Sequence, residues 1–284
     1  MTRHLAFTKM HGAGNDFVVL DGLEQELPAL EALARRMSDR HLGVGFDQLL
    51  VVQPSRAADF RMEIYNADGS QAEMCANGIR AFFKYLRDAG HTSAPEIRVE
   101  TLGGIVVPRW VGDDQVCVDM GSPVLAPAKI PTQLGDAAGE GPVLDVPLVV
   151  EGAALRVSVV SMGNPHCVTY VSDVDRAEVG RLGPAIEHHP AFPSRVNVEF
   201  VQPIGRERLR QRTWERGTGE TLACGSGACA AAVASILRGL VEPRVAVELR
   251  GGTLDIQWQG PGHSVFMTGP AATVFTGSIQ IEGD

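Results

Sequence analysis

Short apolar or alternating runs recur along most of this chain, and they are typical of β-strands that bury at least one face. Strands are predicted at residues 6–10, 17–20, 48–52 and 60–65, with glycine or asparagine turns near several of them. Another strand is predicted near the C-terminus, at residues 273–281. The pattern therefore predicts a chain rich in β-sheet.

Three segments instead have the apolar spacing of helices. They are residues 27–36, residues 75–87 and residues 228–237. The third is apolar almost all round, which predicts a helix enclosed by sheet rather than one lying on a surface. Gly90 and Gly239 are the expected stops of the second and third helices.

The chain also contains two copies of one pattern. An offset of 149 residues aligns Cys75 with Cys224, and an offset of 148 continues the match as far as Trp110 and Trp258. The first offset also aligns Gly14-Asn15 with Gly163-Asn164, Gln48 with Asn197, Val52-Gln53-Pro54 with Val201-Gln202-Pro203, and Gly78 with Gly227. Because the matches keep one register across most of each half, an internal duplication is predicted. It gives an N-terminal domain of residues 1–121, to which 270–284 return, and a C-terminal domain of 122–269.

Composition limits the classes of function. Hydrophobic residues make up 44% of the 284 and charged residues 21%, as in soluble globular proteins. The net charge of -9 and the lack of a basic tract argue against a nucleic-acid partner. No export signal and no sufficiently long apolar run is apparent, so no membrane partner is expected. An odd number of cysteines, five, with no signal peptide predicts a reducing compartment, the cytoplasm.

Cys75 and Cys224 are the candidate reactive residues. Each opens a predicted helix, where unpaired backbone N–H groups and the helix dipole favour a thiolate and can also hold a carboxylate. Two similar domains facing each other about a pseudo-twofold axis would bring both thiols to one ligand from opposite sides. Inversion of a stereocentre by proton transfer needs such a pair, because a thiolate removes a proton from one face and a thiol returns one to the other.

Polar residues occupy several other repeated positions. They pair as Asn15 with Asn164, Gln48 with Asn197, and Asn66 with Glu215. This pairing predicts a shared ligand cavity. It is not symmetric, because Glu215-Arg216 matches Asn66-Ala67, and an acid beside a base suits a ligand that carries both ammonium and carboxylate groups.

Other readings of the two cysteines remain open at this point. They could form a switching disulfide in a thiol-redox protein, or be inert residues of an anion-binding protein. Cys117, Cys167 and Cys229 are expected in the core. No cofactor and no metal is expected, because the cysteines form no zinc-like cluster and no lysine lies in a Schiff-base motif.

The chain resembles the diaminopimelate epimerase family over essentially its whole length. The motifs that carry the resemblance are His11-Gly12-Ala13-Gly14-Asn15-Asp16-Phe17, Asn66-Ala67-Asp68-Gly69-Ser70, Met74-Cys75-Ala76-Asn77-Gly78, Gly163-Asn164-Pro165-His166, Glu215-Arg216-Gly217 and Cys224-Gly225-Ser226-Gly227. The resemblance implies interconversion of LL- and meso-2,6-diaminopimelate without pyridoxal phosphate or metal, in lysine and peptidoglycan precursor biosynthesis. It implies an α/β (α+β) fold of two pseudo-symmetric domains, each a mostly antiparallel sheet around a central helix. It also implies an active site in the interdomain cleft and a homodimer.

The resemblance also implies a role for each matching residue. Cys75 and Cys224 would be the acid/base pair, and His166 and Glu215 would poise them and orient the reacting amino acid. The side chains expected to hold the substrate are Asn15, Gln48, Asn66, Asn164, Asn197 and Arg216. The backbone N–H groups expected to receive the reacting carboxylate are those of Ala76, Asn77, Gly225 and Ser226. Ala76 departs from the family, which often has glycine there, and its methyl group is expected to crowd the site slightly.

A rival family shares the expected fold. Proline and hydroxyproline racemases typically carry a histidine two residues after the first cysteine, where this chain has Asn77. Their substrates have no second charged end, so Glu215-Arg216 would be surplus in such an enzyme. The residues therefore favour the epimerase of a diamino acid.

Overall fold

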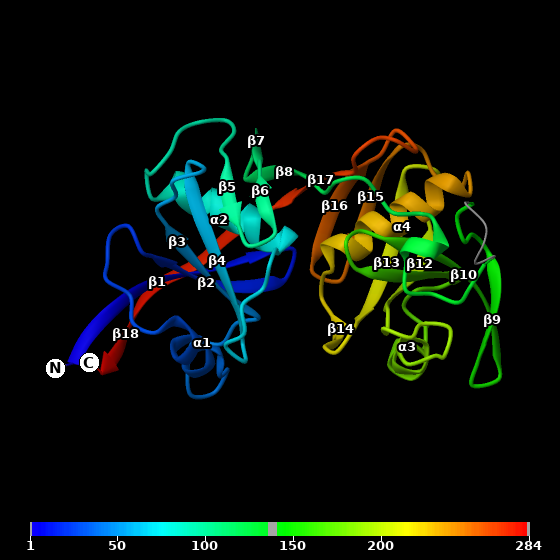
Figure 1. The fold of residues 1–284 in the computed structure, drawn as a ribbon, viewed down its shortest axis with the longest axis horizontal. Helices are drawn as coiled ribbons and strands as arrows, with labels where there is room; N and C mark the ends of the chain where they lie inside the picture. Colours follow the sequence, from blue (N-terminus) through cyan, green and yellow to red (C-terminus); the bar gives the residue numbers. More distant parts are fainter. Residues whose placement is uncertain (1, 136–140, 283–284) are drawn as a thin grey trace. The chain divides into compact units, whose positions relative to one another are not determined.

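A computed structural model describes residues 2–135 and 141–282, and the chain divides into two compact units (Figure 1). Unit 1 comprises Met1–Val118 and Gly269–Asp284, and unit 2 comprises Asp119–Thr268. Both units combine sheet with helices, which confirms the predicted mixed α/β class. Within the described residues, no helix has the length and apolar character needed to cross a membrane.

Unit 1 is built on a seven-stranded sheet in the order β18-β1-β2-β3-β4-β5-β6. Its strands are β1 (Thr2–Gly12), β2 (Asn15–Asp21), β3 (Gln48–Gln53), β4 (Phe60–Asn66), β5 (Val99–Thr101), β6 (Gly104–Val106) and β18 (Ala272–Glu282). Most neighbouring strands are antiparallel, but β2 pairs with β3 and β4 with β5 in parallel. The hairpin β7 (Arg109–Gly112) and β8 (Gln115–Asp119) follows along the chain.

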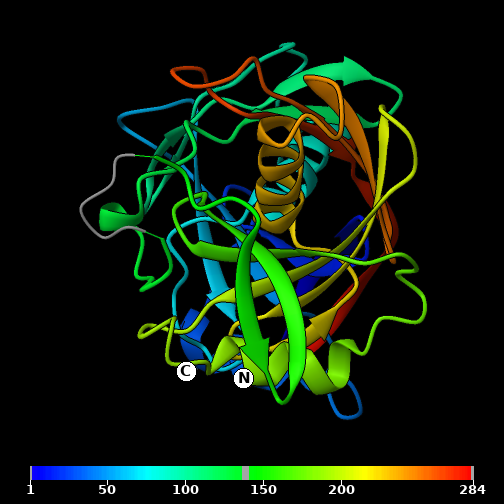
Figure 2. The same cartoon turned by 90° about the vertical axis from the view of Figure 1, so that its right-hand side faces the viewer.

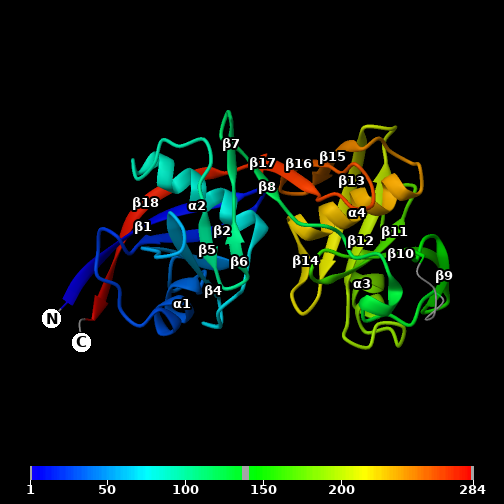
Figure 3. The same ribbon diagram turned by 45° about the horizontal axis from the view of Figure 1, so that its top comes forward.

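Two helices cover opposite faces of this sheet (Figure 3). Helix α1 (Leu30–Ser38) packs Leu33, Ala34 and Met37 into a cluster that contains two alternate apolar residues of β2 and two of β3. Helix α2 (Ala76–Asp88) packs against the other face, where Gly78 lies close to Leu50. Because successive side chains of a strand point to opposite faces, the near-continuous apolar strands β2 and β3 serve both helices.

Unit 2 repeats the arrangement with a larger sheet. The order is β17-β16-β15-β13-β12-β11-β10-β9, and β14 pairs with β13. The strands are β9 (Val146–Val150), β10 (Ala153–Ser161), β11 (Pro165–Tyr170), β12 (Asn197–Pro203), β13 (Arg208–Glu215), β14 (Gly219–Thr221), β15 (Arg244–Leu249), β16 (Gly252–Gln257) and β17 (Phe266–Pro270). The helices are the 3-10 turn η1 (Pro127–Lys129), α3 (Val179–Glu187) and α4 (Gly225–Leu237).

Helix α4 lies inside the curved sheet of unit 2, with strands around much of its length (Figure 2). Ten of its residues are buried, most of them alanine and glycine, so the strands approach the helix backbone closely. The all-round apolar pattern predicted this enclosure correctly. Helix α3 covers the outer face of the same sheet through Val179, Leu182 and Ile186. No separate helix was predicted for α3, which is short and contains Pro184.

The duplication is visible in the registers of strand pairing. In the parallel pair β2–β3, Phe17 faces Gln48, and in β11–β12, His166 faces Asn197. Both members of the second pair lie 149 residues after those of the first. In the parallel pair β4–β5, Phe60 faces Val99, and in β13–β15, Leu209 faces Val247. The first residues of these pairs differ by 149 and the second by 148, which agrees with the change of offset found in the sequence. The internal repeat is therefore confirmed at the level of hydrogen-bonded strands.

Candidate active site

Cys75 caps the N-terminus of α2. Its sulfur accepts a hydrogen bond from the backbone N–H of Gly78, at 3.2 Å. The sulfur also lies 3.8 Å from Oδ1 of Asn15, and the same oxygen accepts from Nδ2 of Asn77 at 3.4 Å. The thiol therefore lies at the positive end of the helix dipole, beside two of the predicted substrate-binding residues.

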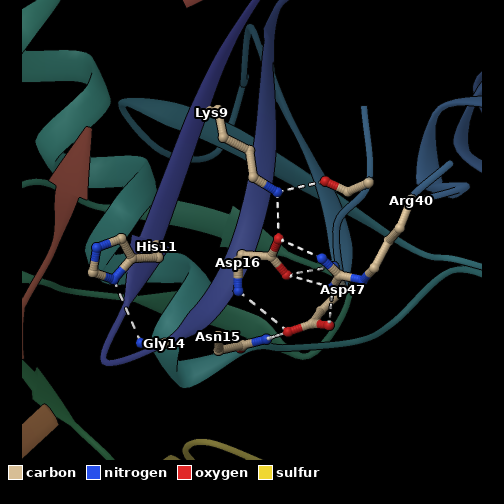
Figure 4. A network of polar contacts seen from close by, with 8 residues as sticks. Lys9, His11, Gly14, Asn15, Asp16, Arg40 and Asp47 are labelled. Atoms are coloured by element: carbon tan, nitrogen blue, oxygen red, sulfur yellow. Dashed lines mark hydrogen bonds and ion pairs between the residues drawn. The ribbon is translucent and has the colours of Figure 1, made fainter. Parts of the chain in front are cut away.

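A charged network fixes the orientation of Asn15 (Figure 4). Nδ2 of Asn15 donates to Asp47 at 2.7 Å, which leaves Oδ1 facing Cys75. Arg40 bridges Asp47 and Asp16, with contacts of 2.8 Å to each. Burial raises the pKa of Asp16, but hydrogen bonds and charge from Arg40 and from Lys9 outweigh burial and hold this pKa at about 2.

Gln48 and Asn66 extend this polar surface across two neighbouring strands. They face each other in the β3–β4 register, and Nε2 of Gln48 donates to Oδ1 of Asn66 at 2.9 Å. Two buried acceptors of unit 1, Oε1 of Gln48 and Oδ1 of Asn77, have no hydrogen-bond partner among the described residues. Unsatisfied buried acceptors are costly, so they mark positions where a ligand can supply N–H groups.

Cys224 caps the N-terminus of α4 in the same way. Its sulfur accepts from the N–H of Gly227 at 3.4 Å, lies 3.6 Å from Oγ of Ser226, and is only 4% exposed. Burial raises the pKa of this thiol well above its usual value, and the carboxylates of Glu215 and Glu199 raise it further. The hydrogen bond from the N–H of Gly227 lowers this pKa, as expected of a helix start, but burial and the two nearby carboxylates outweigh it.

Behind Cys224, three polar side chains form a line into the core of unit 2. Nδ2 of Asn164 donates to Ser226 at 3.3 Å, and Oδ1 of Asn164 lies 2.9 Å from Nε2 of His166. Nδ1 of His166 lies 2.8 Å from Oε1 of Glu199. Both His166 and Glu199 are fully buried. The repeat pointed to Asn164 and the family resemblance to His166, but neither pointed to Glu199.

Glu215 and Arg216 lie in the turn that follows β13. Oε1 of Glu215 accepts from Thr221 at 2.6 Å, and burial raises the pKa of the Glu215 carboxyl despite hydrogen bonds from Thr221 and Cys224. Asn197 accepts from the N–H of Arg216 at 2.9 Å and donates to the carbonyl of Pro165 at 3.0 Å. The carboxamide of Asn197 thus holds this turn to β11.

Each unit brings together the residues predicted from its own half of the sequence. Unit 1 groups Asn15, Gln48, Asn66, Cys75, Ala76 and Asn77. Unit 2 groups Asn164, His166, Asn197, Glu215, Arg216, Cys224, Gly225 and Ser226. The residues that sequence reasoning missed are Asp47, Glu199 and Thr221. A lone glutamate inside the apolar strand Val198–Val201 was the available signal for Glu199.

Comparison with known proteins agrees with the motifs. Residues 7–126 and 158–274 match the family described as diaminopimelate epimerase. A protein of Aromatoleum aromaticum named diaminopimelate epimerase is 51% identical over 280 residues, which cover 98% of this chain and 99% of the relative. A protein of Acidovorax ebreus with the same name is 52% identical over 290 residues, with 98% of each chain covered.

Solved structures share the fold at much lower identity. A phenazine biosynthesis protein of the PhzF family from Bacillus anthracis matches with a TM-score of 0.71 and 14% identity, covering 98% of this chain and 99% of that chain. A hydroxyproline epimerase from Agrobacterium vitis matches with a TM-score of 0.68 and 19% identity, covering 98% and 91%. These structures show the fold alone. The near-complete sequence matches at about half identity, together with the two cysteine-capped helices, show that this chain belongs to the diaminopimelate epimerase family.

Proposed function

We propose that this chain interconverts LL- and meso-2,6-diaminopimelate by proton transfer at one α-carbon, with Cys75 and Cys224 as the two acid/base groups. The reaction belongs to lysine and peptidoglycan precursor biosynthesis and needs neither pyridoxal phosphate nor a metal. The observation that carries the proposal is the cysteine-capped helix that occurs in both units. In both units a cysteine caps a thirteen-residue helix and accepts from the third following N–H.

The proposed mechanism gives the two thiols opposite starting states. Because burial and two carboxylates raise the pKa of Cys224, this residue starts as the thiol that donates a proton. Cys75 then serves as the base, and the dipole of α2 and the N–H of Gly78 support its thiolate once its proton has left the hydrogen bond to Asn15. In the reverse direction the roles exchange, as microscopic reversibility requires. One proton leaves the α-carbon and one arrives, so the charge of the enzyme is unchanged after a turnover.

Backbone N–H groups stabilise the negative charge that develops during this transfer. Ala76 and Asn77 open α2, and Gly225 and Ser226 open α4, so their N–H groups lack partners within the helices. Such groups can bind the carboxylate next to the reacting carbon and support its carbanionic form. Only the N–H of Ala76 is needed for this, so the methyl group does not remove the function.

The remaining polar residues suit a substrate with a second amino-acid end. Glu215 and Arg216 offer one negative and one positive group, and the unsatisfied oxygens of Gln48 and Asn77 can accept from an ammonium group. Asn15, Asn66, Asn164 and Asn197 complete the proposed binding set. A proline or hydroxyproline racemase is the alternative of similar fold, but Asn77 stands in place of its usual histidine and makes a contact to Asn15.

The test is proton exchange followed by mass spectrometry. In deuterium oxide, diaminopimelate incubated with the protein should gain one deuterium at an α-carbon, and Cys75→Ser and Cys224→Ser should each abolish the gain. Dialysis against a chelator should leave the rate unchanged. Deuterium exchange into proline but not into diaminopimelate would instead support a proline racemase activity. No exchange with either substrate, in protein that is folded, would leave the thiol-redox and anion-binding readings.

We also propose that the protein acts in the cytoplasm as a homodimer. The odd number of cysteines supports a reducing compartment, and the family resemblance supports the dimer. Light scattering at several protein concentrations measures the mass directly. A constant mass near 30.3 kDa would refute the dimer.

A further inference from the structure

His166 and Glu199 form a buried polar pair against the inner face of the unit 2 sheet. Nδ1 of His166 lies 2.8 Å from Oε1 of Glu199, and both side chains are 0% exposed. The second oxygen of Glu199, Oε2, has no partner among residues 2–135 and 141–282. A buried carboxylate with half its acceptors unsatisfied costs stability, so its presence needs a reason.

The repeat shows that the fold does not require this pair. The counterparts of His166 and Glu199 at the offset of 149 are Phe17 and Leu50, which occupy the same register positions in β2 and β3 and are also fully buried. A hydrocarbon pair therefore fills in unit 1 the place that a polar pair fills in unit 2. A role in packing alone does not explain Glu199.

Glu199 also lies directly under the start of α4. A Cβ added to Gly227 would come within 2.6 Å of Oε1 of Glu199, whereas a Cβ on the counterpart Gly78 would meet Leu50 at 3.2 Å. Gly227 is the residue whose N–H binds the sulfur of Cys224. The carboxylate is thus packed against the same turn that holds the thiol.

A continuous line of contacts leads from this carboxylate to the thiol. It runs from Glu199 to His166, then to Asn164 at 2.9 Å, to Ser226 at 3.3 Å, and to the sulfur of Cys224 at 3.6 Å. A carboxylate only accepts, so it retains the proton on Nδ1 and leaves Nε2 to face Asn164. In the neutral Nδ1–H form Nε2 carries no proton, so the carboxamide of Asn164 turns its amino group to Nε2 and its oxygen to the hydroxyl of Ser226.

We propose that Glu199 is a positioning residue for the Cys224 half of the reaction. It fixes the ring orientation and the Nδ1–H tautomer of His166, and through Asn164 and Ser226 it sets which hydrogen bonds reach the sulfur of Cys224. No proton passes through Asn164; the line transmits orientation. This inference rests on the proposed function for its effect on rate, but its structural part is testable without turnover.

The first test replaces Glu199 by glutamine, which keeps the size and removes the charge. Glu199→Gln should lower kcat for diaminopimelate epimerisation by about 100-fold or more, since a histidine released from its carboxylate partner adopts the wrong tautomer. KM should change less than kcat, because the side chain of Glu199 is fully buried. The matched control is Glu248→Gln, which removes a half-exposed carboxylate of the same unit held by Arg208. The control should retain the parental kcat.

The second test asks whether Glu199 acts through His166. In a His166→Gln background, adding Glu199→Gln should lower kcat by less than twofold, since residues that act as one unit are not additive. If the losses in kcat of the two single variants add up in the double variant, Glu199 acts independently of His166 and the proposal is overturned. Thermal denaturation of all four proteins identifies any loss that comes from unfolding.

The third test reads the tautomer directly in protein labelled with ¹⁵N-histidine. The His166 signals are identified by their absence in His166→Gln. Parental protein without substrate should show His166 protonated at Nδ1, and Glu199→Gln should lose this preference. A parental His166 with a bare Nδ1 would refute the proposal. If the spectra agree but no diaminopimelate turns over, the proposed function fails while the positioning role stands.

Discussion

Unit 1 supplies a natural replacement for the buried polar pair of unit 2. We predict that the double variant His166→Phe/Glu199→Leu, which copies Phe17 and Leu50, folds about as stably as the parent. Each single variant should be much less stable. In His166→Phe the carboxylate stays buried without its partner, and in Glu199→Leu the imidazole does.

The magnitudes follow from complete burial of both side chains. Removing one partner of a buried pair lowers the free energy of unfolding by about 3–5 kcal/mol, because the other charge or polar group stays buried and unpaired. Replacing both by packed apolar groups is commonly neutral or stabilising by about 1–4 kcal/mol. The phenylalanine ring is larger than the imidazole, and overpacking should lower the free energy of unfolding by about 1–3 kcal/mol. The double variant should therefore lie within about 3 kcal/mol of the parent, and the coupling energy should be about 3 kcal/mol or more.

The assay must report on unit 2 alone, because a protein with two units need not unfold in one step. Trp110 belongs to unit 1, whereas Trp214 and Trp258 belong to unit 2. In a Trp110→Phe background, tryptophan fluorescence during urea unfolding follows unit 2. Linear extrapolation then gives the free energies of unfolding of the parent, the two single variants and the double variant, which together form a double-mutant cycle.

Two results would refute this reasoning. A double variant as unstable as the worse single variant would mean that the two units are not interchangeable at this position. Single variants within about 1 kcal/mol of the parent would mean that the pair is not closed off from water, contrary to its burial. A double variant that folds as stably as predicted should still lack epimerase activity, since it contains no His166.

Three further predictions concern the remaining contacts. Asp47→Asn should lower kcat/KM by about tenfold, because the lost charged hydrogen bond no longer orients Asn15; steady-state kinetics measure this, and an unchanged kcat/KM would contradict the role of the network. Asp16, with its pKa held at about 2, stabilises the fold fully above its unfolded pKa near 3.8 and loses this contribution as the pH falls through 2. In Asp16→Asn the free energy of unfolding, measured by circular dichroism, should therefore fall less steeply between about pH 4 and 2 than in the parent. An unchanged pH dependence in this range would be inconsistent with the low pKa. Cys75→Ala and Cys224→Ala should each lower kcat at least about 1,000-fold at unchanged thermal stability, and a variant that keeps a tenth of the activity would remove that cysteine from the mechanism.

Much of the fold was readable from local patterns. Helical spacing located α2 to within one residue at each end and α1 to within three. The all-round apolar character of α4 predicted its enclosure, although the apolar spacing begins only at Ala228 and the helix begins at Gly225. Glycines have low helix propensity, so only packing within unit 2 makes them helical.

The candidate site divides in a similar way. The repeat located both cysteines and most of their polar neighbours, because each copy keeps its residue types at fixed spacing. Asp47 and Glu199 escaped notice, since each acts on a residue more than thirty positions away through a parallel strand pair. No short-range pattern records which side chains such pairing brings together.

The sequence alone determined that this protein is a duplicated α/β chain with a cysteine before each long helix, because periodicity and helix starts are local properties. The difference between the two cysteines arises from long-range packing. By local chemistry both are thiols at a positive helix end. In the folded unit, Cys224 is buried beside Glu215 and Glu199, which raise its pKa, while Cys75 faces the carboxamide of Asn15. Electrostatics sums over neighbours from distant parts of the chain, and those neighbours exist only once the strands have paired.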